Sequence, residues 1–481
     1  MLGRSRTGLG LLAAGVLLAS AGVTAAGAAA AAATTCATTP STVVRGIQIT
    51  DPGCGFAPLA GSTVSAGVLH GSAYRIEVPA HWNRTLVMFA HGFNGTGTVV
   101  KVDNPQLRSY FIAHGYAWAA SSYRKNGYNV GDGVLDTHDL LVNFPALSHH
   151  AKPRAVYMSG LSMGGEITAV EIEHYRRQFV GAMPYCGVLG ANHLFDYYLG
   201  ANATAAALTK TPIRYPLTAA DGAAYTPSYD QTVQQELPKL GISTDAGSLS
   251  FTTHLTPTGA QWSRAVEQLS GGTRPGFTGA LAFWNGFGFP PLTNIPFLFG
   301  LYPGLSGGTI GYANGNVAGN IHTTYQLDNN PALTAAERSL NRTVLRVHPT
   351  NTPTTDPARS ELPNITGDPR IPVLSLHDIG DLFVPLKMDQ LYAQQLASHH
   401  QSRLFTDRVI RGTGHCEFTD HELASGFTDL VNWVRTGHQA AGDQILNRKA
   451  VARTTFGCRF TDPTKGAHIF FGPTCPPTRH H

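Results

Sequence analysis

The residues at positions 160–164 read Gly-Leu-Ser-Met-Gly and follow an apolar run. The pattern Gly-x-Ser-x-Gly is typical of a nucleophilic serine held on a sharp turn between a strand and a helix. In such a turn the positions two before and two after the serine lie against each other, so both need a residue without a Cβ atom. Ser162 is therefore predicted to attack the carbonyl carbon of a substrate.

The residues after Ser162 favour a helix over positions 163–177. Apolar residues recur in it at helical spacing, and a mostly polar set accompanies them: Glu166, Glu171, Glu173, Arg176 and Arg177. The serine would then lie at a helix N-terminus, where unpaired backbone N–H groups stabilise an anion.

A nucleophilic serine of this kind takes its acid and its base from loops after later strands, in that order. Residues 371–377 have the pattern of a short buried strand, and the loop after them carries Asp378 and Asp381. We favour Asp381 as the acid and keep Asp378, which lies nearer the strand end, as the alternative acid. A strand at 403–410 leads into a Gly-rich loop with His415, the predicted base.

The oxyanion that forms during such a reaction needs two hydrogen-bond donors. The backbone N–H of Met163, directly after the serine, is the first candidate. The second is expected in the loop after an apolar strand at 85–90, where we favour the N–H of Phe93 over Asn94. His91 is expected to hold this loop by hydrogen bonding.

With these residues in place, the chain resembles secreted bacterial serine hydrolases of the α/β-hydrolase superfamily over residues 86–186 and 371–435. The place of Asp381 before Leu-Phe-Val-Pro is similar to the acid loop of that superfamily. The resemblance implies an α/β fold with a mostly parallel central sheet, helices on both faces and a large inserted cap domain. It also implies hydrolysis of a carboxylic ester, thioester or amide without a cofactor, and the fold does not choose among these.

There is also a partial likeness to the tannase and feruloyl esterase group, in which a cysteine beside the catalytic serine bridges a cysteine directly after the catalytic histidine. Cys416 matches the second cysteine, but Leu161 stands where the first is expected. The substrate class therefore does not carry over. Cys186, at the end of the strand after the serine turn, would lie close enough in such a fold to bridge Cys416 instead.

The first 33 residues have the features of an export signal, with Arg4 and Arg6 before a short apolar core and an Ala-rich stretch. The apolar part is shorter than the ~20 residues of a membrane span, and no other segment qualifies. Six cysteines suit an oxidising compartment, so we expect a secreted protein. Proximity suggests two more disulfides: Cys36 with Cys54, and Cys458 with Cys475.

The formal net charge of +4 is too small for a protein that binds nucleic acid through its phosphates. Neither the cysteines nor the His-His pairs have the spacing of metal ligands. Ser425 stands where a zinc motif beginning at His421 would need its second histidine, so no metal is expected.

The long stretch between the strand near 186 and the strand near 371 exceeds what a strand–helix connection needs, and it predicts an inserted cap over the carboxyl edge of the sheet. Within it, residues 272–312 are dense in Gly, Pro and aromatic residues, among them Trp284 and Phe299. The sequence leaves open whether these aromatics line a substrate site or form the cap's own core. The expected segments are a signal peptide at 1–33, core at 34–188, cap at 189–368, core at 369–437 and a disulfide-stapled tail at 438–481.

Three functions fit these observations. The first is a secreted ester hydrolase that acts on a small-molecule or polymeric ester through an acyl-enzyme on Ser162. The second is an aminopeptidase or amidase of the same fold, for which Glu337, Asp328 or Glu361 of the cap would bind the substrate amine. The third is a non-catalytic surface protein that kept the fold, and it predicts a degraded set of catalytic residues.

Overall fold

The computed structural model describes residues 42–44, 47–49, 56–95, 97–214, 222–244, 251–289, 292–300, 316–351, 353–464 and 469–476. The chain divides into the units Met1–Ala37 and Thr38–His481, and all described residues belong to the second. The predicted signal peptide and the predicted Cys36–Cys54 pair lie outside the described residues. Within the described ranges, no helix combines the length and apolar character that crossing a bilayer requires.

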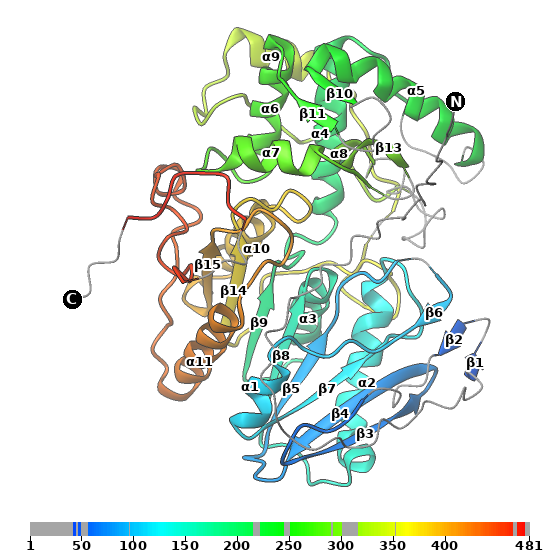
Figure 1. Cartoon of the computed structure of the whole chain (residues 1–481), viewed down its shortest axis with the longest axis vertical. Helices are drawn as coiled ribbons and strands as arrows, with labels where there is room; N and C mark the ends of the chain where they lie inside the picture. The colour runs from blue at the N-terminus through cyan, green and yellow to red at the C-terminus, as the bar shows by residue number, and fades with distance from the viewer. Residues whose placement is uncertain are drawn as a thin grey trace, which may run out of the picture. The chain divides into compact units, whose positions relative to one another are not determined.

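The described part of the chain is built on an eight-stranded sheet of order β15-β14-β9-β8-β5-β7-β4-β3 (Figure 1). Its strands are β3 (Ser62–Leu69), β4 (Ser72–Pro79), β5 (Thr85–Ala90), β7 (Tyr116–Ser121), β8 (Ala155–Leu161), β9 (Gly181–Tyr185), β14 (Val373–Asp378) and β15 (Phe405–Ile410). β4 pairs antiparallel with β3 and β7, and every other pair in this sheet is parallel. The mostly parallel sheet that the sequence predicts is confirmed.

Helices cover both faces of this sheet (Figure 1). On one face lie α2 (Val130–Ser148), α3 (Met163–His174) and α10 (Lys387–Ser398), and on the other lie α1 (Arg108–Ala113) and α11 (Asp420–Thr436). β5 illustrates why both faces are buried, because Leu86 and Met88 belong to one hydrophobic cluster while Val87 and Phe89 belong to the other. This strand order and helix arrangement is the α/β-hydrolase fold.

Short elements flank the sheet. They are β1 (Thr42–Val44), β2 (Ile47–Ile49), β6 (Val99–Val100), the 3-10 helix η3 (Ser402–Leu404) and α12 (Arg448–Val451). β1, β2 and β6 form a small sheet of their own.

The cap is the stretch between β9 and β14. It contains α4 (His193–Thr209), α5 (Gly222–Leu240), β10 (Ile242–Thr244), β11 (Phe251–Thr253), α6 (Pro257–Leu269), α7 (Phe277–Asn285), β12 (Gly288–Phe289), β13 (Leu292–Pro296), α8 (Phe297–Gly300) and α9 (Ala335–Thr343). Phe299 stacks on Trp262 with ring centroids 5.4 Å apart, and both rings are buried, so Phe299 belongs to the cap's own core. The exact cap boundaries at 189 and 368 stay a prediction.

The turn at Ser162 has the crowding that the sequence predicts. Ser162 has φ 56° and ψ −124°, a conformation that L-residues rarely adopt. A Cβ atom on Gly160 would lie 2.2 Å from the carbonyl oxygen of Gly164, and one on Gly164 would lie 2.1 Å from that of Ala90. Both glycines are therefore required by close backbone approach, which confirms the reason given for the motif.

The helix after Ser162 differs from its sequence pattern. The predicted helix is present but ends at His174 instead of 177, and its polar residues Glu166, Glu171 and Glu173 are all buried. The reason is that α3 packs against β8 and β9 on one side and against α2 on another, so it has little solvent-facing surface. Each buried carboxylate binds a polar group; Glu173, for instance, accepts the backbone N–H groups of Thr366 and Gly367 at 2.6 and 2.8 Å.

Replacing Gly164 by alanine should destabilise the fold strongly. The new Cβ atom would overlap the carbonyl of Ala90, so α3 or β5 must shift, and we expect a loss of roughly 3 kcal/mol in the free energy of unfolding. Urea titration of wild type and Gly164→Ala measures this. Gly97→Ala is the matched control, since a Cβ there meets nothing within 4 Å. Equal midpoints for all three proteins would contradict the crowding argument.

Candidate active site

Three side chains from distant parts of the chain meet after the carboxyl ends of β8, β14 and β15. Nε2 of His415 lies 2.8 Å from Oγ of Ser162, and Nδ1 of His415 lies 2.5 Å from Oδ2 of Asp381. The side chain of Asp381 is fully buried, whereas that of His415 is 17% exposed. The structure thus brings together the three residues that the sequence singled out as nucleophile, acid and base.

The loop after β14 holds the Asp381 carboxylate in a fixed orientation. Its Oδ1 accepts the backbone N–H groups of Phe383 and Val384 at 2.8 and 3.0 Å, which leaves Oδ2 to face His415. Asp378, the alternative acid, instead accepts the backbone N–H of Glu417 at 2.8 Å. Burial, followed by the charge of Asp381, raises the pKa of Asp378 well above its usual range. Asp381, and not Asp378, is the carboxylate beside the imidazole.

A buried ion pair that the sequence analysis missed lies behind this loop. Nδ1 of His377, on β14, is 2.6 Å from Oδ2 of Asp389, on α10, and both side chains are fully buried. Burial lowers the pKa of His377, but the charge and hydrogen bond of Asp389 outweigh it and the pKa is raised overall. Nε2 of His377 lies 2.8 Å from the carbonyl oxygen of Val384.

His377 therefore reaches Asp381 through one residue, because Val384 accepts from His377 with its carbonyl and donates to Asp381 with its N–H. One sequence signal could have revealed the His377–Asp389 pair: His377 stands in an otherwise apolar strand pattern. A polar ring buried in such a strand needs a polar partner.

The two expected oxyanion donors belong to segments next to the serine. Met163 is the first residue of α3, so its N–H has no acceptor within that helix. The loop with Phe93 comes close to the serine, because a Cβ on Gly92 would lie 3.1 Å from Cβ of Ser162. The roles of Met163 and Phe93 as donors stay predictions.

His91 and Asn94 hold that loop in place. The His91 ring stacks on Tyr123 at 4.0 Å, its Nδ1 lies 2.7 Å from the Gly92 carbonyl oxygen, and burial lowers its pKa. The side-chain amide of Asn94 donates to the carboxylate of Asp103 at 2.8 Å, which ties the loop to the segment after β6.

Two of the expected disulfides are present among the described residues. Cys186 bonds Cys416 with their Cα atoms 5.3 Å apart, and Cys458 bonds Cys475. The first bond ties the end of β9 to the residue directly after His415. Among the described residues, the possible ligand atoms of Cys186, His415 and Cys416 lie close enough together to hold a metal ion. Both sulfurs, however, are bonded to each other in the disulfide.

The cap contacts both loops of the site. The indole N–H of Trp284 lies 3.0 Å from the Gly380 carbonyl oxygen and 2.9 Å from that of Thr413, so one cap residue touches the acid loop and the base loop together. Arg274 donates to the Ile379 carbonyl at 2.8 Å. Trp284 is therefore a structural link between cap and core, and neither it nor Phe299 supports the substrate-wall interpretation.

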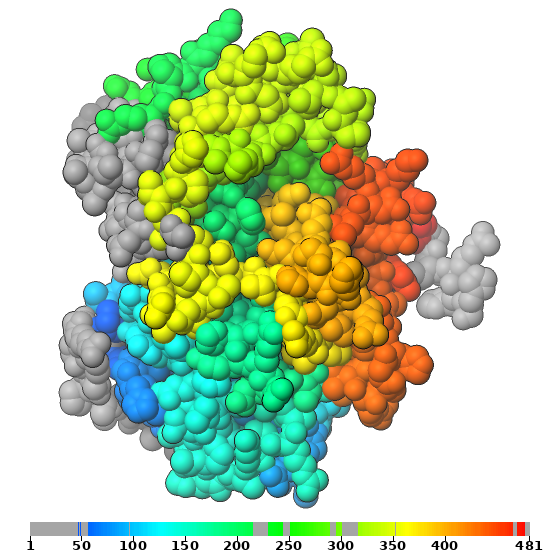
Figure 2. All heavy atoms as spheres, turned by 180° about the vertical axis from the view of Figure 1, so that it is seen from behind, coloured from blue at the N-terminus to red at the C-terminus, as the bar shows by residue number. Residues whose placement is uncertain are grey.

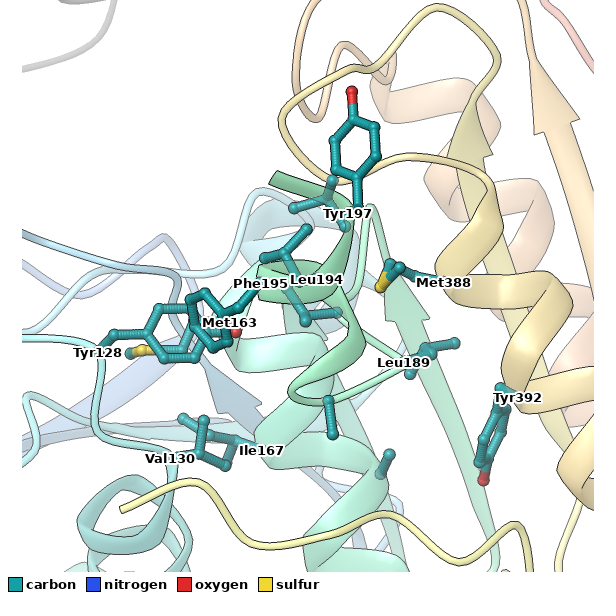
Figure 3. Packing of buried hydrophobic residues seen from close by; sticks show 14 of the residues in the cluster. Tyr128, Val130, Met163, Ile167, Leu189, Leu194, Phe195, Tyr197, Met388 and Tyr392 are labelled. Carbon is teal, nitrogen blue, oxygen red and sulfur yellow. The ribbon is translucent and has the colours of Figure 1, made fainter. Parts of the chain in front are cut away.

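An apolar layer lies beneath the serine turn. Figure 3 shows Met163 of α3 at the rings of Tyr128 and Phe195, which are 5.3 Å apart, and Ile167 of the same helix next to Val130. The hydroxyl of Tyr128 donates to the buried Glu166 at 2.6 Å. Burial raises the pKa of Glu166 from 4.5 to about 8, although the bond from Tyr128 opposes this.

The chain has similarity to several known proteins. No family model matches the sequence. A stretch of 93 residues is 32% identical to an o-phthalyl amidase of Xanthobacter agilis. This stretch covers 19% of this chain and 20% of the length of that relative.

Solved structures with similarity include feruloyl esterase B from Aspergillus oryzae, at 15% identity and a TM-score of 0.43 over 82% of this chain and 85% of that chain. The alpha/beta hydrolase domain-containing protein 10 from mouse is 12% identical, with a TM-score of 0.34 over 77% and 98% of the two chains. The rice cell wall degrading esterase LipA from Xanthomonas oryzae is 15% identical, with a TM-score of 0.33 over 79% and 90%.

The buried Glu166 predicts a pH dependence of stability. The pKa of Glu166 is raised on folding. Its contribution to the free energy of unfolding is therefore fully present below about pH 4.5 and is lost as the pH rises through about 8. Between these pH values the glutamate lowers the free energy of unfolding of the wild type by about 1.4 kcal/mol per pH unit, and Glu166→Gln should abolish this slope. Urea titrations at several pH values measure the difference. Asp328→Asn, at an exposed carboxylate, should keep the wild-type slope; an unchanged slope in Glu166→Gln would contradict the assignment.

Proposed function

We propose that the protein is a serine hydrolase that cleaves carboxylic esters through an acyl-enzyme on Ser162. The observation that carries the proposal is the position of His415, whose two ring nitrogens lie within hydrogen-bond distance of Ser162 and Asp381. A hydroxyl beside an imidazole that is itself oriented by a buried carboxylate is the arrangement that activates serine as a nucleophile.

The reaction follows from this arrangement. His415 takes the proton of Ser162 at Nε2 as Oγ attacks the ester carbonyl carbon, and Asp381 stabilises the imidazolium. The N–H groups of Met163 and Phe93 stabilise the oxyanion. The intermediate collapses when His415 returns the proton to the leaving alcohol, and a water molecule activated by the same imidazole then releases the acid and restores Ser162.

Amide cleavage is the second candidate, and the short match to an o-phthalyl amidase favours it. The aminopeptidase variant of this idea needs a free carboxylate in the cap. Glu337 does not supply one, because its two oxygens accept the N–H groups of Leu327 and Thr334 at 2.6 Å each in the capping box of α9. Asp328 is exposed and Glu361 is partly buried.

Export of the protein also belongs to this proposal. The disulfides Cys186–Cys416 and Cys458–Cys475 suit an oxidising compartment, and the first 33 residues have the composition of a cleaved leader. Because the intact serine–histidine–carboxylate geometry is the opposite of a degraded one, a non-catalytic surface protein is the least favoured function.

Labelling with a fluorophosphonate probe tests the nucleophile. Wild type should be labelled, Ser162→Ala should not, and Ser398→Ala, at an exposed serine, should behave as wild type. The labelled protein is then compared on p-nitrophenyl acyl esters, aryl amides and aminoacyl anilides. Ester turnover alone supports the proposal, amide turnover moves the conclusion to an amidase, and a folded wild type without labelling refutes both.

His377 should influence turnover without touching the substrate. His377→Gln removes the imidazole that lies 2.6 Å from Asp389 and donates to the Val384 carbonyl, so the Val384 residue that donates to Asp381 is held less firmly. We therefore expect kcat to fall about tenfold or more while KM changes little. Steady-state kinetics on the best ester gives both constants. His421→Gln, at an exposed histidine of α11, is the control. A rise in KM at unchanged kcat would speak against a positioning role.

A further inference from the structure

A separate cavity of about 300 Å³ lies where the cap, α10 and the C-terminal part of the chain meet. Its lining comes from residues 268–273, 323–329, 387–394 and 445–451. Figure 2 shows the face on which gold α10 adjoins the orange-red segment after Gly437 and the lime segment before α9. None of the lining residues belongs to the site around Ser162.

The cavity carries two cations and no carboxylate in its lining. Lys387 is partly buried at the start of α10, and its ammonium makes no hydrogen bond or ion pair with any residue in the described ranges. Arg448 lies at the exposed rim and donates to the Asn329 carbonyl at 3.1 Å, but it too has no carboxylate partner there. Burial, with the charge of Arg448 added, lowers the pKa of Lys387. The partly buried charge of Lys387, unpaired within the described ranges, favours an anion in the cavity, and Arg448 adds a second positive charge at the rim.

The rest of the lining consists mainly of uncharged hydrogen-bonding groups. Five amide side chains and three threonines contribute to it: Gln268, Gln326, Asn329, Gln390, Gln394, Thr273, Thr323 and Thr324. The apolar side chains among them are Leu269, Ile445, Leu446 and Val451. The amide N–H groups of Gln268, Gln326 and Gln390 donate within the protein, so these side chains offer their oxygens to a ligand. Amide oxygens and threonine hydroxyls beside an apolar surface suit a ring whose hydroxyl groups donate to them.

The walls are held together by hydrogen bonds of the protein itself. The Gln390 side chain donates to the carbonyls of Gly271 and Ile445 at 2.9 and 3.0 Å, and it thereby joins three of the four lining segments. The backbone N–H of Lys387 donates to the carbonyl of Ser270 at 3.3 Å, which fixes the backbone of Lys387 at the junction with the cap. The cavity is therefore preorganised, and binding needs little rearrangement.

We propose that this cavity binds one small hydroxylated anion of the sugar-acid class, with its acid group between Lys387 and Arg448 and its hydroxyls on the amides and threonines. The volume lies at the lower end of the range for ligand pockets, roughly 300–1,000 Å³, and it suits a single ring. The acid group is a carboxylate or a phosphate. This inference does not depend on the proposed hydrolase function, since it shares no residue with that site.

Isothermal titration calorimetry on the full chain tests the proposal with galacturonate, glucose 6-phosphate, neutral glucose and inorganic phosphate. We expect at least one acidic sugar to bind at about tenfold higher affinity or more than glucose. Binding of galacturonate alone assigns a carboxylate ligand, and binding of glucose 6-phosphate alone assigns a phosphate. Equal affinity for glucose, no binding of either acidic sugar, or inorganic phosphate bound as tightly as the acidic sugars would overturn the proposal.

Variants place the binding in the cavity. Lys387→Gln and Arg448→Gln should each weaken binding about tenfold or more, while Lys449→Gln, at the next residue of α12 but outside the lining, should leave it unchanged. Arg448 is exposed, so its variant keeps the test valid if Lys387→Gln does not fold. Unaltered affinity in a folded Arg448→Gln protein would refute the assignment.

Discussion

The fixed carboxylate of Asp381 is the interaction on which the arrangement around Ser162 depends. A side chain at the tip of a loop would rotate freely, but two backbone N–H groups hold one of its oxygens and leave the other to the imidazole. Val384, which supplies one of these groups, also accepts a hydrogen bond from His377 with its carbonyl, and His377 lies against the buried carboxylate of Asp389. The residue that orients the acid is thus itself held by a buried pair, and hydrogen bonds at low dielectric make such a chain of contacts stiff.

The base is held by independent means. The disulfide from Cys416 fixes the residue after His415, and the carboxylate of Glu417 accepts the N–H groups of Thr413 and Gly414 at 3.0 and 2.8 Å. Trp284 adds a bond from the cap to the same loop. His415 lies in a loop, outside any helix or strand. Its imidazole nevertheless keeps its position, because each of these contacts constrains a different part of the loop.

The sequence was informative where chemistry or crowding leaves few choices. The glycines around Ser162 are required by carbonyl groups about 2 Å from where a Cβ would be, and such close approach has a fixed local pattern. The burial of Glu166 and Glu173 on α3 was not predictable, because periodicity describes one helix alone, whereas this burial comes from segments distant in the chain. His377 was missed for the same reason, since its partner Asp389 lies on another element.

The bond between Cys186 and Cys416 has a consequence for the cap. These cysteines are 230 residues apart, and the whole insertion lies between them, so the cap is enclosed in a covalent ring that closes beside the imidazole. In the chain-entropy model, closing a ring of this length raises the free energy of the unfolded chain by about 5 kcal/mol. The end of β9 and the histidine loop therefore stay tethered to each other through a covalent bond that does not depend on the folding of the cap.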